Sequence, residues 1–220
     1  MRNVLVLLSG GQDSATCLAW AIQKFDQVHT LSIDYGQRHR IELGCSQKLS
    51  EIAQASSHTE LKFETFSQLG DSALIGKGDI TQPHRSSKDL PASFVPGRNY
   101  VFLGLAAAKA YQLGIHDIIT GVCETDYSGY ADCRDTSIKA IQVALSLCLD
   151  YNIVVHTPLM WKNKAETVLF MKDLGRLDWY KYTHTCYEGA QPPCGKCPAC
   201  KLRAKGFLEA GIKDPLLEKN

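Results

Sequence analysis

The chain has 220 residues, of which 45% are hydrophobic, and its 24 basic and 23 acidic residues leave a net charge of +1. This length allows one α/β domain with a well-buried core and a small additional segment. A balanced charge argues against the basic stripe of a tRNA or DNA binder, so we expect no direct nucleic-acid partner. The opening apolar run, residues 4–8, is far shorter than the roughly 18 residues of a membrane span. We therefore expect a cytoplasmic protein without a membrane partner.

Short β-rich runs alternate with longer helical patterns along the chain, which predicts parallel strands joined by helical crossovers. The predicted strands are 4–8, 28–34, 59–63, 117–121 and 152–156. The predicted helices are 14–24, 40–55, 99–113, 137–149 and 164–173. The expected fold class is α/β, an open parallel sheet with helices on both faces.

Two segments depart from this alternation. Over residues 66–96 the apolar periodicity is lost and Gly, Asp, Ser and Pro accumulate, which predicts a long loop insertion. Such a loop is either a substrate lid or, for 76–88, a disordered surface excursion. After Gly175, aromatic residues and cysteines precede a short last helix. We therefore divide the chain into an α/β domain over 1–175 and a small C-terminal subdomain over 176–220.

A glycine turn joins the first predicted strand to the first predicted helix. Residues 9–14 read Ser-Gly-Gly-Gln-Asp-Ser. Such a turn directs backbone N–H groups and the positive end of a helix dipole at one point, which suits a phosphate or pyrophosphate. Asp13 can face a phosphate only across a cation, so the turn predicts Mg²⁺ at Asp13. An ordinary Gly-Gly turn is the alternative.

Polar clusters follow two further elements, on the side of a parallel sheet where ligands bind. Tyr35, Gln37 and Arg38 come after the second strand, and Arg38 can meet a phosphate or a developing negative charge. Arg98 and Asn99 follow Pro-Gly at a helix start and can present donors to an anion. The residues after the second strand could instead be first-turn helix residues that face water. The residues after Pro-Gly could instead belong to a plain Pro-Gly turn.

The segment after the fourth predicted strand is dense in charge. Residues 121–135 contain four carboxylates, two tyrosines and one arginine. Carboxylates accept from ring N–H groups, tyrosines stack on flat rings, and an arginine pairs with a carboxylate. Although each residue alone fits a solvated loop, together they predict a pocket for a nitrogen-rich heterocycle. We expect Arg134, in preference to Arg98, to anchor a substrate carboxylate.

Nine cysteines divide into two groups. Five are scattered along the chain, which indicates a reducing compartment and not a disulfide framework. The other four are Cys186, Cys194, Cys197 and Cys200, whose spacing can close a tetrahedron around one ion. A closed four-thiolate site is typical of structural zinc. An iron–sulfur cluster and a disulfide pair remain as alternatives.

These motifs resemble those of known families. The glycine turn resembles the SGGxDS loop of the PP-loop ATP pyrophosphatases, a Rossmann-like superfamily that splits ATP between its α and β phosphates. Further motifs resemble those of the 7-cyano-7-deazaguanine synthase family and stand in the same order, over residues 3–207. They are DYGQRH, FVPGRN, GVCETDYSGYADCRD, TPLMW with KAET, and the terminal cysteines. Ala131 departs from the proline expected in GYPDCR, while the neighbouring Asp132, Cys133 and Arg134 are kept.

The resemblance implies an ATP-dependent ligase that makes the nitrile precursor of queuosine from 7-carboxy-7-deazaguanine and ammonia. It implies adenylation first of the carboxylate and then of the amide, with Mg²⁺ and one structural zinc per chain, held by the four terminal cysteines. The implied catalytic residues are Asp13, Arg98 and Lys164. The implied ATP contacts are Leu8, Ser9, Gly10, Gly11, Gln12, Asp13, Ser14, Ala15, Thr16, Cys17, Leu18 and Arg98. The implied substrate contacts are Tyr35, Gln37, Arg38, Glu124, Asp126, Tyr130, Asp132 and Arg134.

Two other functions remain open from the residues alone. A PP-loop enzyme that acts on tRNA would normally bring a basic surface or an RNA-binding domain. A zinc-ribbon nucleic-acid-binding module would leave the glycine turn without a purpose. The sequence does not set the oligomeric state, and a homodimer is one option.

Overall fold

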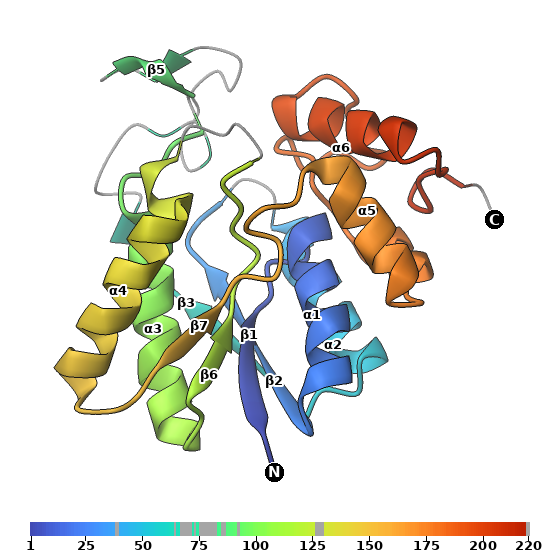
Figure 1. Ribbon diagram of the computed structural model, residues 1–220. Helices are drawn as coiled ribbons and strands as arrows, with labels where there is room; N and C mark the ends of the chain where they lie inside the picture. The colour runs from blue at the N-terminus through green and yellow to red at the C-terminus, as the bar shows by residue number, and fades with distance from the viewer. Residues whose placement is uncertain are drawn as a thin grey trace.

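Five parallel strands form the central sheet, in the order β3-β2-β1-β6-β7 (Figure 1). The strands are β1 (Asn3–Leu7), β2 (Gln27–Asp34), β3 (Ser57–Lys62), β6 (Asp117–Ile119) and β7 (Val154–His156). The structure is a computed structural model that describes residues 1–37, 40–63, 65–66, 72, 74, 83–84, 87–91, 93–125 and 130–218. Every neighbouring pair of strands in this sheet runs parallel, which confirms the predicted open parallel sheet.

Helices cover both faces of the sheet (Figure 1). One face carries α1 (Gln12–Lys24) and α2 (Ile41–Ile52), and the other carries α3 (Arg98–Leu113) and α4 (Asp135–Leu149). The helix α5 (Lys164–Asp173) packs on the α1 side, and α6 (Pro198–Glu209) packs on α5. All five predicted helices are present, to within three residues at each end.

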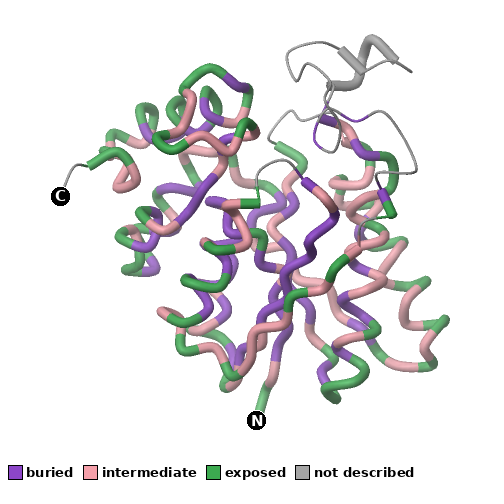
Figure 2. The backbone as a smooth tube through the Cα atoms, turned by 180° about the vertical axis from the view of Figure 1, so that it is seen from behind, coloured by how far each residue is buried: buried purple, intermediate pink, exposed green. Residues whose placement is uncertain are grey.

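The core lies on the two faces of the central strands. Val4 and Val6 point toward α1 and α5, whereas Leu5 points toward α3, as expected for side chains that alternate along a strand. These side chains are at most 1% exposed. Figure 2 shows the buried backbone concentrated along the central strands. A sheet buried on both faces holds the ends of its strands, and the loops that follow them, in fixed positions.

The predicted insertion over 66–96 contains structure that the sequence did not indicate. Within it, β4 (Pro83–His84) and β5 (Ser87–Pro91) form a two-stranded antiparallel sheet. β4 has only two residues, and β5 reads Ser-Lys-Asp-Leu-Pro, with one aliphatic residue and a proline, so neither shows the alternation that predicts a strand. The other expectation, disorder over 76–88, falls mostly on residues outside the described ranges.

A buried arginine fixes the C-terminal part of the chain. Arg203 on α6 is 5% exposed and donates from Nε and Nη2 to both carboxylate oxygens of Asp214, at 2.6 and 2.8 Å. Its Nη1 donates to the Thr183 hydroxyl at 2.8 Å. This fork therefore joins α6, the segment before the cysteines and the last turn. The domain boundary at residue 175 stays a prediction.

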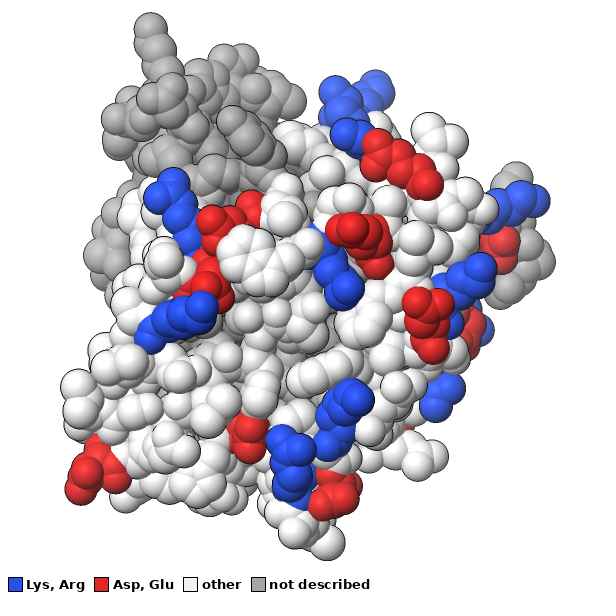
Figure 3. Space-filling view, viewed as in Figure 1, with Lys and Arg blue, Asp and Glu red and all other residues white. Residues whose placement is uncertain are grey.

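The charged side chains are of mixed sign on the face drawn in Figure 3, where basic and acidic groups are interspersed. Exposed pairs such as Lys48 with Glu51 and Lys205 with Glu209 contribute to this pattern. Among the described helices, none has the length and hydropathy that crossing a membrane requires.

Candidate active site and cysteine cluster

A cavity of about 340 Å³ lies beyond the carboxyl ends of β1, β2 and β6. This is where open parallel sheets bind ligands, and the volume is within the usual range for small-molecule sites. The predicted site residues that line it are Leu8, Ser9, Gly11, Gln12, Asp13, Ser14, Tyr35, Gln37, Arg98, Tyr130 and Lys164. The fold thus brings the glycine turn, the end of β2, the start of α3 and the start of α5 to one place.

The glycine turn is held in its shape by its own hydroxyl groups and by a close approach to α2. The Ser9 and Ser14 hydroxyls lie 3.0 Å apart, and the Gly11 N–H faces the Ser9 oxygen at 3.3 Å. Gly10 has φ +89°, and a Cβ there would lie 2.1 Å from the Glu42 carbonyl oxygen. The position therefore admits only glycine. The residues at the start of α1 line the cavity, and the first N–H groups of a helix have no partner within the helix, so this helix start suits an anion.

Asp13 and Lys164 form an ion pair in the cavity wall. The Lys164 Nζ donates to both carboxylate oxygens of Asp13, at 2.9 and 2.7 Å. The Lys164 side chain is 13% exposed and that of Asp13 is 34% exposed. The family resemblance implies that both residues are catalytic, and the structure adds that they pair.

The local sequence explains why Lys164 lies there. Asn163 and Glu166 form a capping box, with hydrogen bonds of 2.9 and 2.8 Å, so α5 begins at Lys164. From the other side α6 approaches so closely that a Cβ on Gly206 would lie 2.6 Å from the Lys164 Cβ. Lys164 is therefore fixed by a helix start and by a helix contact.

Arg98 is surrounded by tyrosines. Its guanidinium carbon lies 5.8 Å from the ring centroid of Tyr35 and 6.0 Å from that of Tyr130, and Nη1 donates to the Tyr35 hydroxyl at 3.4 Å. Within the part of the chain that the structure describes, Arg98 has no carboxylate partner. Burial raises the pKa of Tyr35 and of Tyr130, so both hydroxyls stay protonated and can donate hydrogen bonds.

Three predicted substrate residues lie outside the cavity lining. Asp132 accepts from the Asn99 N–H at 3.0 Å, at the start of α3, and Glu124 accepts from the Asp135 N–H at 2.9 Å, at the start of α4. Arg134 is exposed at the N-cap of α4. The two carboxylates thus stabilise helix N-termini, a role that acidic residues before a helix commonly have. The remaining predicted substrate contacts, Arg38 and Asp126, lie outside the described residues.

Several cavity residues were not identified from the sequence, and Cys133 and Tyr187 are two of them. Cys133 lines the cavity, where its sulfur accepts from the Asn99 side-chain amide at 3.3 Å, and burial raises its pKa to about 12. Tyr187 comes from the cysteine-rich segment and also lines the cavity. Tyr187 lies between two of the predicted metal ligands in the chain. This is the one signal in the sequence that could have indicated that its position is fixed.

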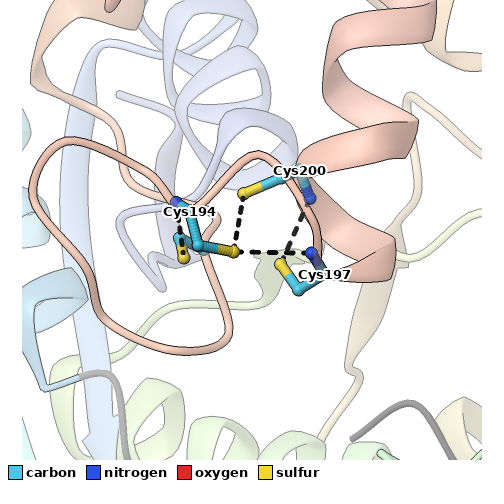
Figure 4. Close-up of side chains that lie close together, drawn as sticks. Cys194, Cys197 and Cys200 are labelled. Carbon is cyan, nitrogen blue, oxygen red and sulfur yellow. Dashed lines mark hydrogen bonds between the residues drawn. The ribbon is translucent and has the colours of Figure 1, made fainter.

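The four C-terminal cysteines form a compact cluster (Figure 4). Their sulfur atoms all lie within 4.8 Å of one another, and those of Cys194 and Cys200 are 4.0 Å apart. Thiolates about 2.3 Å from one tetrahedral zinc ion would be about 3.8 Å apart, so the donor set fits zinc. Backbone N–H groups of Lys196 and Cys197 lower the pKa of Cys194 to about 7, whereas burial raises the pKa of Cys197 and of Cys200.

Comparison with known proteins agrees with this site. The profile of a family described as queuosine biosynthesis protein QueC matches residues 3–211. A 7-cyano-7-deazaguanine synthase from Chromobacterium violaceum is 50% identical over 221 residues, with 99% of this chain and 94% of the relative covered. A protein of the same name from Laribacter hongkongensis is 49% identical, with 99% and 95% covered.

A solved 4-thiouridine synthetase, in complex with RNA and ATP, shares the fold with a TM-score of 0.53. It is 16% identical, and the match covers 96% of this chain and 50% of that one. This likeness agrees with the predicted α/β fold, and the profile and the curated relatives confirm the family that the motifs resemble. The chain is an enzyme of the QueC family of queuosine biosynthesis proteins.

Proposed function

We propose that the chain converts 7-carboxy-7-deazaguanine, ammonia and ATP into 7-cyano-7-deazaguanine. One observation carries this proposal. A single cavity joins an anion-binding helix start, at residues 9–14, to an arginine that has tyrosines and no described carboxylate around it. The first feature suits the phosphates of ATP, and the second suits a flat substrate that carries a carboxylate. The names of the curated relatives support the same reaction.

The reaction we propose has two activations. A carboxyl oxygen of the substrate attacks the α-phosphorus of ATP, and pyrophosphate leaves from the glycine turn. Ammonia then displaces AMP and gives an amide. The amide oxygen attacks the α-phosphorus of a second ATP, pyrophosphate leaves again, and loss of AMP and of both amide protons leaves the nitrile. The side chains form no covalent intermediate, because positioning and charge neutralisation supply most of the acceleration.

Asp13 and Lys164 are charged groups in the cavity wall, and Asp13 belongs to the glycine turn itself. We infer that Asp13 would hold a magnesium ion, which neutralises phosphate charge when bound. Lys164 holds the Asp13 carboxylate in the cavity wall and carries a positive charge that the nucleotide can share. Both side chains remain partly exposed to the cavity, as contact with a diffusible ligand requires.

We further infer that the cysteine cluster holds one structural zinc ion. All four positions of a tetrahedron would be filled by thiolates, so the metal would have no open position for catalysis. Its effect on the reaction would be indirect, through the residues that it keeps in place.

The chemistry predicts where oxygen atoms go. When 7-carboxy-7-deazaguanine carries oxygen-18 in its carboxylate, each activation should transfer one label to AMP, and the amide supplied alone with ATP should yield the nitrile. Mass spectrometry of the nucleotide and of the deazapurine measures both. ADP as the product, or AMP without label, would mean that the carboxyl oxygen never attacked the α-phosphorus. The fold assignment would survive that result, since fold and reaction are separate claims.

The geometry shifts the proposed carboxylate anchor from Arg134 to Arg98. We expect Arg98→Lys to weaken binding of 7-carboxy-7-deazaguanine at least tenfold, because lysine keeps the charge but loses the two-pronged contact. ATP affinity should change less than about threefold, since the glycine turn is intact. Arg134→Lys, at an exposed position outside the cavity lining, is the matched control and should change neither affinity. Calorimetry with each ligand decides, and a larger loss in the Arg134 variant would return the anchor to Arg134.

A further inference from the structure

Tyr187 connects the cysteine cluster to the cavity. It follows Cys186 directly in the chain, and its side chain lines the same cavity as Arg98, Tyr35 and Tyr130. Its phenol is close enough to Tyr130, Arg98 and Tyr35 to interact with them electrostatically. Tyr35, Tyr130 and Tyr187, which we call the tyrosine cage, therefore line one cavity with Arg98 and come from three separate segments: the end of β2, the turn before α4, and the cysteine-rich segment.

The backbone of Tyr187 is fixed by the cluster on two sides. Cys186 precedes it, and this residue is fully buried, with its sulfur accepting from the Cys194 N–H at 3.4 Å. The backbone N–H of Tyr187 itself also interacts with the sulfur of Cys197. A turn closed by the Gly189 N–H and the Cys186 carbonyl, at 3.0 Å, holds the following residues. A side chain with its main chain tied in this way has few alternative directions in which to point.

The tyrosine cage has the chemistry of a receptor for a flat, anionic ring. Arg98 supplies a positive charge without a described carboxylate partner, so the anion that pairs with it can come from a ligand. Phenol rings stack on a flat heterocycle, and their hydroxyls donate to oxygen or ring nitrogen atoms. Tyr187 adds a third phenol ring and a third hydroxyl to the lining of the same cavity.

We propose that Tyr187 is a substrate-positioning residue, which the cysteine cluster holds beside Arg98 so that the cavity recognises the carboxylate-bearing deazapurine. This inference rests on the proposed function. It gives the cluster a second role, because the metal that fixes the backbone on both sides of Tyr187 would thereby set the shape of the substrate end of the cavity.

Two substitutions test the role of Tyr187. Tyr187→Phe keeps the ring and removes the hydroxyl, and Tyr187→Leu removes the ring as well. We expect the first to raise the calorimetric Kd and the KM for 7-carboxy-7-deazaguanine about fivefold, and the second at least tenfold. The Kd and KM for ATP should stay within about twofold, and kcat should change less than the KM for the deazapurine. Tyr182→Phe, in the same segment but outside the cavity lining, should change none of these values.

Zinc content and melting temperature accompany each measurement, so that a defect in folding is recognised. Unchanged deazapurine affinity in both Tyr187 variants would overturn the inference, as would equal losses for ATP and for the deazapurine. If the unaltered enzyme makes no nitrile from 7-carboxy-7-deazaguanine, the proposed function itself fails, and the Tyr187 variants do not decide that question. A wild type that is active, with variants that bind as it does, would refute only the role of Tyr187.

Discussion

Replacing Asp13 with alanine should reduce turnover by roughly 1,000-fold or more and leave the fold intact. The carboxylate faces the proposed phosphate site and is held by Lys164 at 2.7 Å, so its loss removes a preorganised charge from the reacting centre. Asp13 is also one-third exposed and fills no space in the core. We therefore expect the melting temperature to fall by no more than about 5 °C. Release of pyrophosphate and thermal unfolding measure the two effects.

The control for this variant is a substitution in a second ion pair, whose residues do not line the cavity. Glu51 pairs with Lys48 on α2 at 3.4 Å, and both side chains are more than half exposed. Glu51→Ala should leave turnover unchanged, because an exposed pair contributes at most about 1 kcal/mol and touches no ligand. Asp13→Asn keeps the volume without the charge and should be nearly as inactive as Asp13→Ala. Normal pyrophosphate release from either Asp13 variant would remove this residue from the mechanism.

Replacing Cys197 with serine should remove the metal and lower the melting temperature by roughly 10 °C or more. Cys197 is 3% exposed, caps α6, and its sulfur lies among the four that surround the proposed ion. Because metal binding is coupled to the folding of such a segment, losing one ligand removes several kcal/mol from the free energy of unfolding. Elemental analysis should find about one zinc per chain in the unaltered protein and close to none in the variant.

Cys148→Ser provides the comparison. Cys148 is an exposed cysteine on α4, outside the cluster, and its replacement should alter neither the zinc content nor the melting temperature. If the purified protein is brown and contains iron, the four cysteines hold an iron–sulfur cluster and not zinc, which is the alternative that the cysteine spacing left open. Full stability of Cys197→Ser without bound metal would show that the cluster does not support the fold.

Features that depend on neighbours in the chain were predictable from the sequence. The start of α5 at Lys164 follows from Asn163 and Glu166, three residues apart, which form the capping box seen in the structure. The glycine turn at residues 9–14 was likewise readable, because the strand before it and the helix after it have clear periodicity. In both cases, short-range chemistry determines the local structure.

Features that depend on residues far apart in the chain were not predictable. Asp13 and Lys164 are 151 positions apart, and only the packing of α5 on α1 brings them together. The carboxylates of Glu124 and Asp132 were assigned to a substrate from their density in the segment, whereas the structure uses them at two helix starts. Composition shows that a segment is polar, but the direction of each side chain is set by helices elsewhere in the chain, α3 before Asp132 and α4 after Glu124.

The contact between Gly206 and Lys164 makes the cysteine-rich segment difficult to exchange. A Cβ at residue 206 would collide with the Cβ of Lys164 at 2.6 Å and approach its carbonyl carbon at 3.1 Å. A metal-binding segment transplanted from another protein would need a glycine at the matching place on its helix, or α5 would be displaced together with the lysine that reaches Asp13. The cysteine-rich segment and α5 are thus complementary at this contact. A change in the packing of one would require a matching change in the other.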